Sequence, residues 1–180
     1  CIRDRISPMG LDNKNPDFSW VINSEDYNVS QTHYQIFVAT DEIFSKNSLV
    51  WDSGKVTSDE SVYVKYTGKE LSYDTKYFWT VKVWTNQSKR FYQSKIMNWK
   101  TGLMNADNWK SNWISVIDRD RDVPQAPYFI NDFRLNKKII SATLYITSRG
   151  VYEAHINGER VGDSYLTPGW TSYSNRIQYQ

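Results

Sequence analysis

Several ingredients of common functional sites are scarce in this sequence of 180 residues. Cysteine occurs once, as Cys1, so no disulfide can form within the chain, and iron–sulfur and cysteine-based zinc sites are disfavoured. The two histidines, His33 and His155, lie far apart in the sequence and form no metal-ligand motif. We therefore expect no metal centre built from these residue types.

The sequence also has neither a large net charge nor a long apolar run. Twenty-two Lys and Arg residues against 20 Asp and Glu leave a net charge of +2, which is too little for the electrostatic footprint of a nucleic-acid-binding protein. No run approaches the roughly 18 apolar residues that a membrane-spanning helix needs. We expect neither a nucleic-acid partner nor a membrane span.

Strong helix formers are few, whereas aromatic residues are abundant. Alanine occurs five times and leucine seven times, against 8 Trp, 13 Tyr and 7 Phe. Aromatic and β-branched residues favour strands over helices. The composition therefore predicts an all-β protein.

The first hundred residues read as short alternating or apolar runs that are separated by turn clusters. Such runs at a spacing of roughly 8–12 residues are typical of a β-sandwich. In the longest run, Tyr77, Trp79, Val81 and Val83 share one face, which we assign to the core. The turn before Tyr77 resembles one in which a tyrosine hydroxyl bonds back to the backbone. The expected strands cover residues 18–22, 34–39, 50–56, 61–66, 76–85 and 99–101.

A change of character after Gly102 marks the expected domain boundary. Strands resume later, and Asn157-Gly158 is the strongest hairpin signal in the chain. The second domain, 103–180, offers only four or five strands, which is short for a β-sandwich of about 100 residues. We expect it to be incomplete, with an unpaired strand edge. Its expected strands cover residues 128–135, 141–147, 151–156 and 176–180.

The usual catalytic motifs are not found. The sequence has no glycine-rich phosphate loop, no G-x-S-x-G elbow and no H-E-x-x-H. Adjacent acids such as Asp41-Glu42 and Asp59-Glu60 read as solvated loop charge rather than as a glycosidase pair. We name no catalytic and no metal-ligating residue. A calcium site stays open, because oxygen ligands are plentiful in the loops.

Five blocks, in order along the chain, resemble bacterial α-L-rhamnosidases of glycoside hydrolase family 78. Pro8-Met9-Gly10-Leu11-Asp12 with the run 16–20 is similar to the opening of the family. Three further blocks match strand signatures of its first domain, and the last matches its second domain. These blocks are residues 31–39, 51–56, 77–84, and 150–158 with 161–163 and 168–173.

The resemblance implies a fibronectin-III-like (immunoglobulin-like) sandwich, residues 1–102, followed by part of a jelly-roll-like β-sandwich, residues 103–180. In the family these domains precede a helical barrel that removes terminal α-L-rhamnose from glycans or glycosides. Nothing in this sequence matches the barrel. The resemblance thus implies an accessory N-terminal fragment, inactive alone, whose partners are the missing C-terminal part of its own chain and rhamnose-containing glycans.

Two alternatives stay open for what these residues do: a carbohydrate-binding module pair, or a purely structural spacer. If the chain contacts sugar, we expect the contact near the loop 165–173, because sugars pack their C–H faces on aromatic rings. Loop packing by Trp170 is the competing interpretation. A periplasmic or extracellular location is expected, where polymeric rhamnosides occur. The candidate sugar-binding residues are Trp170, Tyr165, Tyr173, Asn157, Glu153 and Asp163.

Overall fold

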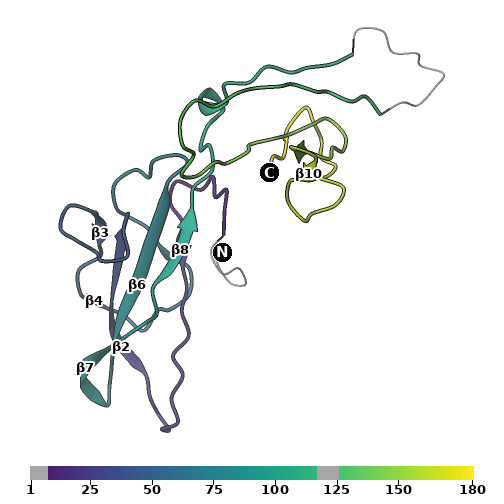
Figure 1. The fold of residues 1–180 in the computed structure, drawn as a ribbon. Helices are drawn as coiled ribbons and strands as arrows, with labels where there is room; N and C mark the ends of the chain where they lie inside the picture. Colours follow the sequence, from purple (N-terminus) through teal and green to yellow (C-terminus); the bar gives the residue numbers. More distant parts are fainter. Residues whose placement is uncertain (1–7, 117–125) are drawn as a thin grey trace. The chain divides into compact units, whose positions relative to one another are not determined.

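The computed structural model describes residues 8–116 and 126–180 and is almost entirely β-structure and loop (Figure 1). The chain divides into two compact units, Cys1–Asn112 and Trp113–Gln180. Within the described ranges the only helical element is a 3₁₀ turn, Ala106–Asn108. No described helix could therefore cross a lipid bilayer. The all-β fold class that the composition predicts is confirmed.

A six-stranded antiparallel sheet forms the larger layer of the first unit. Its centre is the pair β2 (Gln31–Ala39) and β6 (Lys76–Thr85), which lie side by side in Figure 1. The strand order is β3-β2-β6-β7, and β4 and β8 extend the sheet along β2 and β6. The flanking strands are β3 (Leu49–Asp52), β4 (Val56–Thr57), β7 (Ser88–Gln93) and β8 (Met97–Lys100).

A two-stranded ribbon, β1 (Asp17–Phe18) and β5 (Val64–Lys65), forms the second layer. Phe18 of β1 is fully buried, and its ring centroid lies 4.8 Å from that of Trp79 in β6. Tyr77, Trp79, Val81 and Val83 all point into this core, as their alternation predicts. The predicted sandwich is confirmed, although the expected strand 61–66 is reduced to the two residues of β5.

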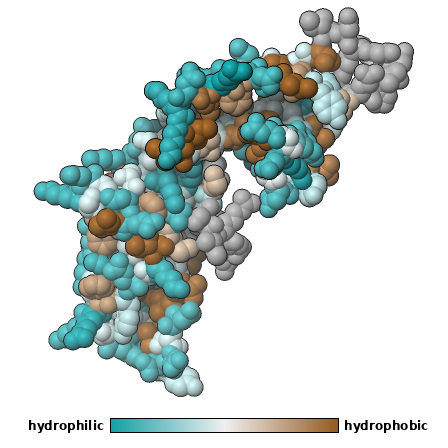
Figure 2. Space-filling view, in the orientation of Figure 1, coloured by the Kyte–Doolittle hydropathy of each residue, from teal (hydrophilic) through white to brown (hydrophobic). Residues whose placement is uncertain are grey.

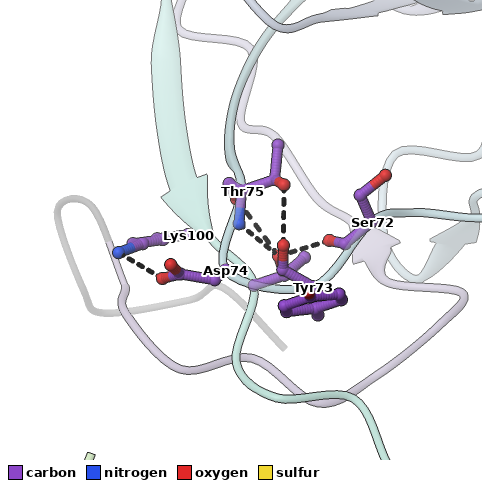
Figure 3. A network of polar contacts seen from close by, with 6 residues as sticks. Ser72, Tyr73, Asp74, Thr75 and Lys100 are labelled. Atoms are coloured by element: carbon purple, nitrogen blue, oxygen red, sulfur yellow. Dashed lines mark hydrogen bonds and ion pairs between the residues drawn. The ribbon is translucent and has the colours of Figure 1, made fainter. Parts of the chain in front are cut away.

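The start of β6 is held by backbone-directed hydrogen bonds. The hydroxyl of Tyr77 accepts a 2.8 Å hydrogen bond from the backbone N–H of Ser72, which confirms the predicted turn. The buried hydroxyl of Thr101 accepts from the N–H of Thr75 at 2.9 Å and donates to the carbonyl of Ser72 at 2.6 Å. Figure 3 shows the hydrogen bonds at Ser72 and Thr75 beside the ion pair of Lys100 and Asp74.

The N-terminal segment closes the first unit against its last strand. Leu11 pairs in parallel with Thr101, with its N–H 3.1 Å from the carbonyl of Lys100. Its own carbonyl accepts from the N–H of Gly102 at 2.9 Å. The two ends of the unit are therefore joined by backbone hydrogen bonds.

The second unit contains far less regular structure than its alternation predicts. Among its described residues, the strands are β9 (His155–Ile156) and β10 (Glu159–Arg160), and an isolated bridge joins Tyr152 and Thr167. The strands expected at 128–135, 141–147 and 176–180 do not form, and that at 151–156 shrinks to β9. A strand needs a neighbour for its N–H and C=O groups. Ile146 and Gln180 exchange two backbone hydrogen bonds, but this contact does not extend into a ladder.

The large apolar side chains of residues 128–144 are exposed to solvent. Figure 2 shows hydrophobic residues at the molecular surface. The most exposed of those in residues 128–144 are Ile140 at 96%, Tyr128 at 94% and Ile130 at 86%. The alternating sequence predicts an apolar face for these segments, but no described strand or helix packs against it.

Candidate functional site

The β9–β10 hairpin brings three ionisable groups of the second unit together, those of Glu153, His155 and Arg160. Asn157 and Gly158 form its turn with φ of 53° and 84°, the left-handed values that a two-residue hairpin of this type requires. The predicted hairpin is confirmed. Its register sets Arg160 opposite His155, so two basic side chains lie across from each other.

Glu153, two residues before β9, contacts both basic groups. One carboxylate oxygen lies 2.7 Å from Nε2 of His155, and the other lies 3.5 Å from Nε of Arg160. The carboxylate is thus shared between an imidazole and a guanidinium. His155 and Glu153 are both largely exposed, so water screens the pair.

These contacts shift the ionisation of both partners. The hydrogen bond from His155 lowers the pKa of Glu153, and the charge of Arg160 adds to the effect. The hydrogen bond to Glu153 raises the pKa of His155 above its ordinary 6.5. Glu153 is therefore held as a carboxylate. A glycosidase general acid needs the reverse, a carboxyl group whose pKa is raised.

Arg160 links this pair to the loop that follows. Its guanidinium lies 4.1 Å from the ring centroid of Tyr165 and donates to the carbonyl of Ser164. The ring of Tyr165 remains 78% exposed. The guanidinium thus holds together a carboxylate, an aromatic ring and a backbone carbonyl.

A small hollow of about 110 Å³ opens beside this cluster. Its lining combines the polar groups Glu153, Arg160 and Ser164 with apolar residues such as Leu144 and Val161. Pockets that enclose small molecules are usually larger, roughly 300–1,000 Å³. The hollow could hold the edge of a sugar ring rather than a whole ligand.

Trp170 and Tyr173 form a second, separate pair of aromatic rings. Their ring centroids lie 5.9 Å apart, and the Tyr173 hydroxyl accepts a 2.8 Å hydrogen bond from the N–H of Gly150. Trp170 is 86% exposed. A loop-packing tryptophan would be covered, and within the described residues this one is not.

The structure brings together only part of the predicted set. Glu153 and Tyr165 meet at Arg160, and Trp170 meets Tyr173. Asn157 lies in the hairpin turn, and Asp163 lies exposed after β10. Sequence analysis did not name Arg160 or His155 as site residues. The Asn157-Gly158 turn was the signal for them, because its register sets these two residues opposite each other.

No metal-ligand cluster accompanies these groups. The described residues contain no set of three or more His, Cys, Asp or Glu side chains that converge on one point. The calcium site considered from the sequence stays a prediction, and the acidic run 118–122 lies outside the described residues.

Two protein-family models match consecutive parts of the chain. Residues 2–105 match the Rha78A-like, N-terminal immunoglobulin domain, and residues 137–180 match the alpha-L-rhamnosidase N-terminal domain. The first match spans more than half of the chain. An alpha-L-rhamnosidase of Formosa agariphila is 35% identical over 96% of this chain and 20% of its own length.

Solved structures agree with this assignment. An alpha-L-rhamnosidase from Dictyoglumus thermophilum is 38% identical over 97% of this chain and 21% of that chain, with a TM-score of 0.84. An alpha-L-rhamnosidase of Streptomyces avermitilis, solved in complex with L-rhamnose, is 41% identical over 62% of this chain and 11% of its own, with a TM-score of 0.59. The chain spans about a fifth of the length of the curated relatives it matches.

Proposed function

Because this chain belongs to the family of Rha78A-like N-terminal immunoglobulin domains, we propose that it is the accessory N-terminal part of an α-L-rhamnosidase. The whole protein would be a glycoside hydrolase that removes terminal α-L-rhamnose from glycans or glycosides. The observation that carries the proposal is the order of the two family matches, an immunoglobulin domain and then a rhamnosidase N-terminal domain.

The chemistry of the candidate site supports an accessory role rather than catalysis. Inverting hydrolysis needs a protonated acid and a carboxylate base about 6.5–9.5 Å apart. Glu153 has both oxygens engaged by His155 and Arg160, and its pKa is lowered, the opposite of what the acid requires. The hollow beside it has Glu153 as its one acidic lining residue among those described. Catalysis would therefore belong to other parts of the polypeptide.

Those other parts are also the partner we propose for the second unit. Its exposed apolar segments, residues 128–144, would be covered by further strands and domains of the same polypeptide. The relatives, about five times as long as this chain, have the residues to supply them. A periplasmic or extracellular location belongs to this proposal, because polymeric rhamnosides are found there.

A rhamnosidase assay on two proteins tests the proposal. The isolated chain is expected to hydrolyse no p-nitrophenyl α-L-rhamnoside, and the full polypeptide in which it occurs is expected to release nitrophenol. Turnover by the isolated chain that Glu153→Gln abolishes and the matched Glu159→Gln retains would contradict the accessory role. A full polypeptide inactive on aryl rhamnosides and on rhamnosylated glycans would contradict the enzyme class.

A second function, sugar binding by the second unit, is favoured by the exposure of Trp170 beside Tyr173. Flat exposed rings bind the C–H faces of sugars, and L-rhamnose is the ligand bound in the Streptomyces avermitilis structure. Titration of L-rhamnose into the chain is expected to give heat that Trp170→Ala removes. Tyr128→Ala, at an equally exposed ring, serves as the control. Binding absent from all three proteins would leave a structural role for the loop.

A further inference from the structure

The outer side of the six-stranded sheet carries a row of lysines stacked on aromatic rings. β6 alternates strictly, so the residues between its core-facing members point to the opposite side. The register places Trp84 between His33 and Phe91, and Lys82 between Gln35 and Gln93. We call this surface the lysine–aromatic face, and define it by Lys55, Lys76, Lys82, Phe37, Phe78, Trp84 and Phe91.

Each lysine of the face has its ammonium group over a ring. Nζ of Lys55 lies 4.4 Å from the centroid of Trp84. Nζ of Lys82 lies between two rings, 4.9 Å from Phe37 and 4.6 Å from Phe91. Nζ of Lys76 lies 5.0 Å from Phe78. These contacts are cation–π interactions, which hold the charges in place without neutralising them.

The strands that build the face carry more positive than negative charge. Asp52 is the single acidic residue in the six strands of the sheet, all of them described, whereas five of their residues are basic: Lys76, Lys82, Lys89, Arg90 and Lys100. The Asp52 carboxylate is already bonded by Gln35 at 2.7 Å and by the N–H of Gly54 at 2.8 Å. The chain as a whole is nearly neutral, so this sheet concentrates positive charge.

The ammonium groups of the face have no counter-charge of their own. The described residues place no carboxylate within ion-pair distance of Lys55, Lys76 or Lys82. Lys55 and Lys76 are exposed and Lys82 is partly exposed. Long lysine side chains can swing from a ring to an incoming anion, which would uncover the ring for stacking at the same time.

An acidic polysaccharide combines the two chemistries that such a face offers. Its carboxylate or sulfate groups would pair with the ammonium groups, and the C–H faces of its sugar rings would pack on Trp84 and Phe91. Single-stranded nucleic acid also combines stacking with charge. The cations stacked on this face are all lysines. Phosphate recognition favours the planar, bidentate guanidinium group of arginine, so the face favours a glycan over nucleic acid.

We propose that the lysine–aromatic face docks an acidic polysaccharide, a glycan chain that bears carboxylate or sulfate groups. The choice of glycan over nucleic acid rests on the proposed function, in which the whole protein acts on sugar polymers. The face would hold a charged polymer through the first unit. The proposal concerns polymer binding alone and assigns the face no part in cleavage.

Affinity electrophoresis of the chain in gels with different polymers tests the proposal. Polygalacturonate (carboxylate) and dextran sulfate (sulfate) form the acidic arms and show which anion is preferred. Neutral dextran and an oligothymidylate are the comparison arms. Retardation is expected in at least one acidic arm and is expected to weaken with salt. Equal retardation by neutral dextran, stronger binding of oligothymidylate, or no retardation in any arm would overturn the proposal.

Charge-matched variants separate a built surface from net charge. Lys55→Gln with Lys82→Gln is expected to raise the Kd by about tenfold. Lys46→Gln with Lys69→Gln removes the same charge from exposed sites elsewhere in the first unit and is expected to have little effect. Equal losses of affinity in the two double variants would show that net charge alone attracts the polymer, and would overturn the proposal.

A ring variant tests the stacking without altering charge. Trp84→Ala is expected to weaken binding several-fold, and Trp84→Phe to restore most of it. Thermal melts check that each variant is folded. The rhamnosidase assay of the full polypeptide on an aryl rhamnoside is read separately. If the full polypeptide binds the polymer but is inactive, the proposed enzyme class is contradicted and the proposed binding face stands. If it is active but does not bind the polymer, the binding face is contradicted and the enzyme class stands.

Discussion

The indole N–H of Trp20 donates a 2.9 Å hydrogen bond to the side-chain oxygen of Gln31, at the first residue of β2. The amide nitrogen of the same glutamine donates to the carbonyls of Ser58 at 3.0 Å and Glu60 at 2.9 Å. Gln31 is only 7% exposed. One buried side chain therefore fastens two separate segments of the first unit, at Trp20 and at residues 58–60, to the central sheet.

Gln31→Leu is expected to destabilise the first unit by about 3 kcal/mol. Leucine fills a similar volume, but it leaves one buried donor and two carbonyls without their partners. Urea denaturation followed by tryptophan fluorescence measures the change. Gln87→Leu removes an exposed hydrogen bond to Tyr27 and should cost under about 0.5 kcal/mol. Equal losses of unfolding free energy in the two variants would contradict the view that Gln31 fastens the surrounding segments to the sheet.

Tyr77→Phe is expected to cost about 1–2 kcal/mol, although the ring and its packing are retained. The lost hydroxyl is the acceptor for the backbone N–H of Ser72, in a hydrogen bond that is partly buried. Thermal unfolding by circular dichroism measures the loss. Tyr27→Phe, at a ring that is 89% exposed, is the matched control. A melting temperature unchanged by Tyr77→Phe would mean that water replaces the hydroxyl.

The titration of His155 should depend on Glu153. The shared hydrogen bond raises the pKa of the imidazole and lowers that of the carboxyl group. The pair therefore supports the hairpin fully at a pH above the ordinary value of 4.5 for Glu and below that of 6.5 for His. The support fades as the pH rises through the raised pKa of His155. It also fades as the pH falls through the lowered pKa of Glu153.

Proton NMR of the His155 ring across pH measures this coupling. Glu153→Gln is expected to move the pKa of His155 back toward its ordinary value, and the matched Glu159→Gln is expected to leave it raised. A midpoint that does not respond to Glu153→Gln would show that the contact is not populated in solution.

The isolated chain should self-associate through its second unit. The apolar side chains of residues 128–144 are exposed, and an extended segment without a strand partner seeks one. Sedimentation velocity is expected to show oligomers that grow with concentration, and Ile130→Asp with Ile140→Asp to reduce them. Ile43→Asp, at an isoleucine that is 86% exposed in the first unit, should not. A wild-type chain that stays monomeric throughout would contradict this expectation.

The first unit could be predicted from the sequence because its contacts are local or self-contained. The alternation around Tyr77, Trp79 and Val81 determines which face is buried, and the partner strand β2 lies in the same chain. The two-residue strand β5 was overestimated, because the alternation of 61–66 continues beyond the backbone pairing with β1. Periodicity shows which side of a segment is apolar, but not how far its ladder extends.

The second unit shows the limit of the same reasoning. Residues 128–135 alternate, but alternation supplies no hydrogen-bond partner, so no strand forms there. At the candidate site, aromatic and carboxylate residues could be selected by type. The role of Arg160 could not, because it depends on a register and a side-chain reach that only coordinates provide.

The pairing of Leu11 with Thr101 has a consequence for biosynthesis. Every strand of the first sheet lies between these two residues, and so do the described residues of its hydrophobic core, apart from the peripheral Met104. A nascent chain therefore holds a complete folding nucleus once residue 102 has left the ribosome, before the second unit has emerged. Domains that emerge first fold first. The immunoglobulin-like unit would thus be able to fold before the apolar segments behind it are exposed to solvent.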